Sequence, residues 1–141
     1  MTQKLGLVQA RTVVDAMLKA AAEKGFIMSA AVVDFGGDLI HLARMDGASA
    51  VTARMSYNKA YTAVKWQKDT KMLRERLFDW SLGDNRREVG WFGDTLYTPI
   101  WGGVVLRAKD GTMLGAIGES GASPEQDEVI GQLGKMTFES L

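Results

Sequence analysis

The stretch 114–128, LGAIGESGASPEQDE, constrains the fold of this chain more than any other part of it. Its apolar start predicts a short buried strand, and the residues that follow predict a bend and then a helix. Ser123 is a typical N-cap, because its hydroxyl can accept from a free N–H of the first turn. Pro124 then falls at the first helical position, and Gln126 can complete a capping box. Glycines at three positions leave the bend free to turn: Gly115, Gly118 and Gly121. Loops at such corners are frequent binding positions.

Length and composition limit the possible functions. A chain of 141 residues is expected to form one domain. The 17 basic and 17 acidic residues balance, which argues against a nucleic-acid or anionic-membrane surface. There is no cysteine, so disulfides, thiolate nucleophiles and zinc-thiolate sites are excluded. The N-terminal residues lack the apolar core of a signal peptide and no apolar run approaches a membrane span, so we expect a soluble, cytoplasmic protein.

The periodicity of apolar residues predicts an α+β domain with a small antiparallel sheet covered by helices. The expected helices are about 8–24, 49–67 with Ser49 as cap, 69–78 with Asp69 and Thr70 as caps, and the stretch after Ser123. The expected strands are 29–34, 39–44, 104–107 and 113–117. Gly36–Gly37 fits a two-residue hairpin loop, and 109–111 predicts a second hairpin turn. The order is helix, two strands, two helices, two strands, helix.

Four stretches in the same order together resemble the haem-degrading GlcG/HbpS-like family, which includes the C-terminal domains of PduO-type corrinoid adenosyltransferases. They are VVDFGGDLIHLARMDGA (32–48), NKAYTAV (58–64), GGVVLR (102–107) and GAIGESGASPEQDE (115–128). The resemblance implies a profilin-like fold, a high-order homo-oligomer that is often an octamer, haem binding in some members and a role in catabolic gene clusters. Many members have a histidine after the two hairpin glycines, where this chain has Asp38.

The only histidine, His41, is the first candidate for an iron ligand. A neutral imidazole could serve as an axial haem ligand or as a general base. On an alternating strand it could equally be a surface or interface residue. Tyr57, Tyr61 and Met45 are the other candidate axial ligands.

A second group consists of Arg44 at a strand end, Asp46 in the following turn and Lys59 on the next helix. Such a group could hold a carboxylate, a propionate or an enolate oxygen, with arginine as the planar bidentate donor. The alternative is a structural ion pair between Asp46 and one of the two cations.

The acids around the C-terminal corner form a third group: Glu119, Glu125, Asp127 and Glu128. Paired carboxylates can perform acid/base catalysis when burial raises the pKa of one of them. The last three are also explained by the positive end of a helix dipole. Glu119 is the acid least explained by local structure, and with Asp46 it is a candidate catalytic residue.

Aromatic residues are concentrated in the irregular stretch 81–98 and just after it: Trp91, Phe92, Tyr97 and then Trp101. They could wall a flat apolar ligand or bury a subunit interface. Together with Tyr61, Gly118 and Gln126, three of them (Trp91, Phe92 and Trp101) are candidate ligand-binding residues.

The leading hypothesis is a homo-oligomeric protein that binds a small ligand near Arg44, Asp46, Lys59 and the 118–126 corner, with haem as the candidate ligand. One alternative is a cofactor-independent isomerase, hydrolase or decarboxylase acting on a small oxygenated or aromatic metabolite. Another is a non-catalytic accessory or scaffold protein. Phosphate loops, dinucleotide fingerprints, nucleophile elbows and two-histidine metal motifs are absent from the sequence. One histidine and no cysteine exclude most dedicated zinc or copper sites, so no metal site is assigned, and a metal held by carboxylates remains the open alternative.

Overall fold

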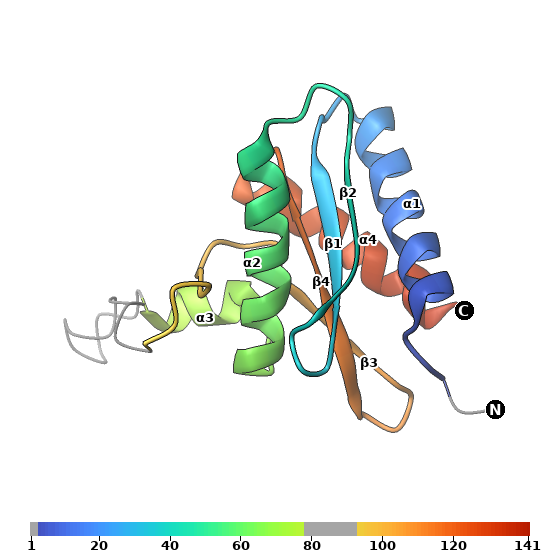
Figure 1. The fold of residues 1–141 in the computed structure, drawn as a ribbon, viewed down its shortest axis with the longest axis vertical. Helices are drawn as coiled ribbons and strands as arrows, with labels where there is room; N and C mark the ends of the chain where they lie inside the picture. Colours follow the sequence, from blue (N-terminus) through green and yellow to red (C-terminus); the bar gives the residue numbers. More distant parts are fainter. Residues whose placement is uncertain (1–2, 78–92) are drawn as a thin grey trace.

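The predicted α+β order is confirmed by the computed structural model, which describes residues 3–77 and 93–141 (Figure 1). Its elements are α1 (Leu7–Glu23), β1 (Ser29–Asp34), β2 (Leu39–Arg44), α2 (Ala50–Trp66), α3 (Thr70–Leu77), β3 (Val104–Arg107), β4 (Met113–Ser120) and α4 (Pro124–Glu139). Strand β4 extends three residues beyond the predicted end at Ile117, so it includes Glu119.

The four strands form one antiparallel sheet in the order β2-β1-β4-β3. Helix α2 packs on one face, and α1 and α4 cover the other (Figure 1). This explains why β1 reads as a continuous apolar run, since a strand covered on both faces has no polar side. Its first five residues are all buried.

Gly118 lets α2 lie directly on β4. A Cβ atom at this position would be 2.2 Å from the Ser56 carbonyl oxygen and 2.6 Å from the Ala60 nitrogen. These are backbone atoms of α2, so a larger side chain cannot be accommodated by a change of rotamer. The small residues of α2 therefore serve close contact between the helix and the sheet.

We expect Gly118→Ala to lower the free energy of unfolding by about 1–3 kcal/mol, because the added methyl group forces the helix away from the strand. Denaturant unfolding followed by circular dichroism measures the change. Gly36→Ala is the matched control: its nearest neighbour would be a side-chain oxygen of Asp34 at 3.3 Å. Equal losses in the two variants would contradict the close-contact explanation.

Two local predictions are wrong in detail. The first hairpin loop has three residues rather than two, because the Asp34 N–H donates to the Asp38 carbonyl at 2.9 Å. Gly37 adopts a φ of 88°, typical of a type I turn followed by a left-handed residue. Ser49 occupies the N-cap position of α2, but its side chain makes no capping hydrogen bond.

Asp69 and Thr70, at the start of α3, form hydrogen bonds with the backbone at the outer edge of β3. The Val105 N–H donates to Asp69 Oδ1 at 3.0 Å, and the Thr70 N–H donates to the Gly103 carbonyl at 2.9 Å. Gly103 in turn donates to Thr70 Oγ1 at 2.9 Å. Residues that the sequence marks as helix caps thus satisfy the free backbone groups of an edge strand.

Candidate functional site

A buried ion pair joins α2 to α4 at the end of the sheet. Lys59 is 1% exposed, and its Nζ donates to Asp127 Oδ2 at 2.9 Å and to the Glu119 carbonyl oxygen at 2.7 Å. The other oxygen of Asp127 accepts from the Ala122 N–H at 3.0 Å. Burial raises the pKa of Asp127, and the neighbouring Lys59 ammonium opposes that shift. This pair locks the bend after β4 to α2.

The Glu119 carboxyl lies against the glycines of two neighbouring segments. A Cβ atom at Gly131 of α4 would be 2.7 Å from Glu119 Oε1, and one at Gly102 would be 2.8 Å from it. The side chain is fully buried, and neither carboxyl oxygen has a hydrogen-bond partner within the described residues. Burial raises the pKa of Glu119 well above its usual range, although Lys59 partly offsets this. Burial without a hydrogen-bond partner among the described residues therefore favours the protonated form of this carboxyl over its carboxylate.

Further acids surround this carboxyl. Glu128 is 8% exposed, and Gln132 Nε2 donates both to Glu128 Oε1 at 2.9 Å and to Asp69 Oδ2 at 3.2 Å. Burial raises the pKa of Glu128, and the hydrogen bond from Gln132 acts against that rise. Burial thus raises the pKa of both Glu119 and Glu128, so this cluster of acids favours proton retention.

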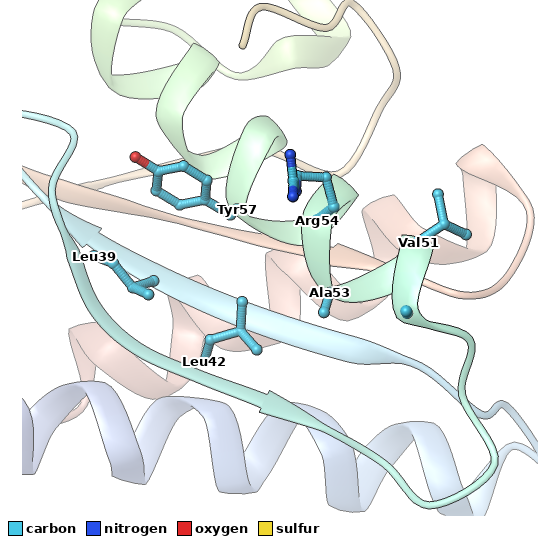
Figure 2. Close-up of a pocket in the computed structure, with 7 residues that line it drawn as sticks. Leu39, Leu42, Val51, Ala53, Arg54 and Tyr57 are labelled. Carbon is cyan, nitrogen blue, oxygen red and sulfur yellow. The ribbon is translucent and has the colours of Figure 1, made fainter.

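A separate open groove of about 580 Å³ lies between β2 and the first half of α2 (Figure 2). Its lining is mostly apolar and includes Leu39, Leu42, Ala50, Val51, Ala53, Arg54 and Tyr57. The two leucines come from the strand, and the other residues come from the helix. Leu39 is 52% exposed and Val51 is 61% exposed, so this apolar surface is uncovered in the single chain. The Arg54 side chain is the one charged group in the lining.

The structure places Arg44 and Glu119 at the same end of the sheet but on opposite faces. Arg44 pairs with Ser29, whose hydroxyl is 2.8 Å from Thr52 Oγ1 of α2. Glu119 pairs with Ala30, which belongs to the core under α1 and α4. Directly paired residues point to the same face and successive residues alternate, so Arg44 faces α2 and Glu119 faces α4. The two side chains do not share a hollow within one chain.

The predicted group of Arg44, Asp46 and Lys59 is not brought together. Arg44 and Asp46 are both exposed, whereas Lys59 is buried and committed to Asp127. His41 pairs with Val32 of the core under α1, on the face opposite the groove. The predicted haem ligand therefore does not line the groove.

Other predicted residues have structural contacts of their own. Tyr61 donates its hydroxyl to Asp94 Oδ2 at 2.6 Å, and this hydrogen bond to a carboxylate is the main cause that raises its pKa to about 12. Gln126 completes the capping box with Ser123. The Trp101 ring lies 4.8 Å from Lys71 Nζ.

The predicted residues Trp91 and Phe92 lie outside the described residues. Within residues 3–77 and 93–141, no group of three or more histidine, cysteine, aspartate or glutamate side chains is arranged to hold a metal ion. No helix in that same part of the chain has the length and apolar character needed to cross a membrane.

One pattern in the sequence does indicate the helical side of the groove. Ala50, Ala53, Arg54 and Tyr57 are spaced at three, four and seven residues, which places them on one face of a helix. The signal lacks specificity, because the same spacing occurs on helices that pack against a core. Pairing Lys59 with Asp127 was not predicted, since Asp127 was already explained by the helix N-terminus.

The sequence matches the family model described as "Haem degrading protein HbpS-like" over residues 5–134. It is 32% identical over 111 residues to GlcG of Escherichia coli K12, which covers 79% of this chain and 77% of GlcG. It is 28% identical over 141 residues to an uncharacterized 15.0 kDa protein from the dhaT-dhaS intergenic region of Citrobacter freundii, covering 96% of this chain and 92% of that protein.

Solved structures with the same fold include Klebsiella pneumoniae protein ORFY, with a TM-score of 0.89 and 26% identity over 100% of this chain and 94% of the other. The PduOC:heme complex has a TM-score of 0.85 and 25% identity, covering 95% of this chain and 94% of PduOC. A crystal structure of HbpS has a TM-score of 0.81 and 28% identity, and the match covers 96% of this chain and 91% of HbpS.

Proposed function

Because this chain belongs to the HbpS-like family of haem-degrading proteins, we propose that it is a homo-oligomeric haem-binding protein that serves a catabolic pathway in the cytoplasm. The related PduOC structure is of a haem complex. The observation that carries the proposal for this chain is the uncovered apolar groove between β2 and α2, with a cation and a phenol in its lining.

The lining of the groove fits the chemistry of haem. The faces of the porphyrin are flat and apolar, which suits Leu39, Leu42 and Val51. The exposed Arg54 guanidinium would pair with a propionate, and the Tyr57 phenol would approach the iron. Tyr57 donates only a long hydrogen bond of 3.3 Å to the Gly37 carbonyl, so its oxygen is weakly committed. Haem would supply a redox-active iron centre, and these residues would hold and orient it.

A haem titration followed at the Soret band tests this proposal. We expect Arg54→Gln to weaken haem affinity about tenfold, because a charge-assisted hydrogen bond is lost. We expect Tyr57→Phe to change the Soret maximum. His41→Gln is the matched control, because His41 lies on the opposite face of β2.

Two outcomes would contradict this placement. If the protein produces no Soret shift at all, it does not bind haem. If His41→Gln alters the spectrum while Tyr57→Phe leaves it unchanged, the iron ligand is His41 and haem binds on the α1 side of the sheet.

One observation favours a second candidate function, a cofactor-independent enzyme. The buried Glu119 carboxyl lies beside the Lys59–Asp127 pair, and burial raises its pKa, which favours the protonated form that a general acid needs. Turnover of a screened oxygenated or aromatic metabolite would support this candidate, and turnover that survives Glu119→Gln would exclude Glu119 as its general acid. The absence of turnover with every screened metabolite would count against the candidate.

A further inference from the structure

A second cavity, of about 720 Å³, lies where the start of α3, strand β3 and the end of α4 meet. Its volume is within the range of small-molecule sites. Among the residues that line it are Lys68, Met72, Val105, Arg107, Lys109 and Lys135. None of its lining residues belongs to the groove between β2 and α2, so a ligand here would be bound independently of haem.

The four cations come from four different segments: Lys68 from the turn before α3, Arg107 from β3, Lys109 from the following turn and Lys135 from α4. The chain as a whole has a formal net charge of +0, so this concentration of positive charge is local. Segments that are far apart in the sequence thus contribute positively charged side chains to the lining of one cavity. Such an arrangement favours an anionic ligand.

The two acids in the lining, Asp69 and Glu139, offset part of this charge, and the four cations still leave an excess of two positive charges. Asp69 accepts from the Val105 N–H at 3.0 Å and from Gln132 Nε2 at 3.2 Å, so its carboxylate is directed at neutral donors rather than at the four cations. Glu139 lies 3.8 Å from Lys135, in an exposed pair on α4. An exposed pair of this kind is weak. Lys68, Arg107 and Lys109 remain to attract a ligand.

Arg107 is held in a fixed orientation. Its Nη1 donates to the Gly111 carbonyl at 3.2 Å and its Nη2 donates to the Gln67 carbonyl at 3.0 Å. Gln67 has a φ of 62°, and it is the only residue other than glycine with a positive φ in the described part of the chain. A guanidinium that is already positioned loses less entropy when it binds a carboxylate, and three of its five N–H donors remain available.

The cavity also has an apolar part. Met72 is 51% exposed, and Val105 and Ala108 are beside it in the lining. Inorganic anions have no apolar surface to place against these side chains. A short hydrocarbon segment does, and burying it contributes affinity in proportion to its area.

We propose that this cavity is a binding site for a small organic dianion, such as a compact dicarboxylate. One carboxylate pairs with the fixed Arg107 guanidinium, and the other lies among Lys68, Lys109 and Lys135. The hydrocarbon between them packs on Met72 and Val105. The site recognises two negative charges separated by a short apolar chain.

Isothermal titration calorimetry of the full chain with succinate, at pH 8 and low salt, tests the proposal. We expect saturable binding, and we expect Arg107→Gln and Lys109→Gln each to weaken it by about tenfold or more. Lys109 is an exposed turn residue, so its variant does not depend on correct packing of the core. Arg11→Gln removes an exposed cation from α1 and should leave the affinity unchanged.

Two further ligands complete the test. Butyrate has the same carbon chain with one charge, and it should bind at least tenfold more weakly than succinate. Inorganic phosphate supplies charge without an apolar body, and it should also bind more weakly. The proposal is overturned if succinate binding does not saturate, or if butyrate or phosphate binds as tightly as succinate. It is also overturned if Arg11→Gln weakens succinate binding as much as Arg107→Gln does. Haem titration of Arg107→Gln should match the unmodified protein.

Discussion

Replacing Lys59 by methionine is expected to lower the free energy of unfolding by about 3–5 kcal/mol, because it leaves a buried carboxylate without its cation. Lys59 is 1% exposed, and its ammonium binds both Asp127 and the Glu119 carbonyl. Methionine keeps most of the side-chain volume and removes the charge. Urea unfolding of both proteins at pH 7 measures the loss.

Two variants separate the buried pair from general effects of charge. Lys135→Met removes a cation from an exposed pair with Glu139 at 3.8 Å and should cost no more than about 0.5 kcal/mol. In the double variant of Lys59→Met with Asp127→Asn, the unpaired carboxylate is gone, so part of the lost stability should return. Equal losses for Lys59→Met and Lys135→Met would contradict the role assigned to the buried pair.

Replacing Glu119 by glutamine is expected to make stability less sensitive to rising pH. Burial raises the pKa of Glu119 well above the usual value of 4.5. Above pH 4.5 the unfolded chain releases this proton while the folded chain keeps it, so the stability that Glu119 contributes falls as the pH rises through the folded pKa. The slope from one such group is about 1.4 kcal/mol per pH unit. Glutamine has a similar shape and no proton to lose.

Unfolding of the two proteins at several values between pH 5 and pH 9 measures this difference. Asp127 and Glu128 also have raised pKa values and remain in the variant, so the curve should become shallower rather than flat. Glu125→Gln changes an exposed acid in the first turn of α4 and serves as the control. Parallel curves for the unmodified protein and Glu119→Gln would mean that Glu119 is already ionised in the folded state.

The C-terminal corner was predictable because its determinants are local. The Gln126 N–H donates to Ser123 Oγ at 3.2 Å, and Gln126 Oε1 accepts from the Ser123 N–H at 3.0 Å. Pro124 occupies the first turn, as predicted. Each of these contacts spans three residues or fewer, so the sequence contains all the participants side by side. The same holds for the hydrophobic periodicity that predicts the helices and strands.

The candidate site was predicted only in part, because its contacts depend on register and long-range packing. Lys59 and Asp127 are 68 residues apart, and no local pattern pairs them. Arg44 and Glu119 lie at the same end of the sheet, as expected, but on opposite faces. A shift of one residue in strand register exchanges the faces of a strand, and the register is set by the packing of the whole sheet.

By itself, the sequence determined the α+β class, the order of the elements and the capped corner before α4, because periodicity and capping act between neighbouring residues. The tertiary structure alone decided which side chains meet. It buried Lys59 with Asp127, enclosed Glu119 against Gly131, and left the groove beside Arg54 open. Burial and charge pairing are properties of residues brought together across the chain, and they determine which groups are available for chemistry.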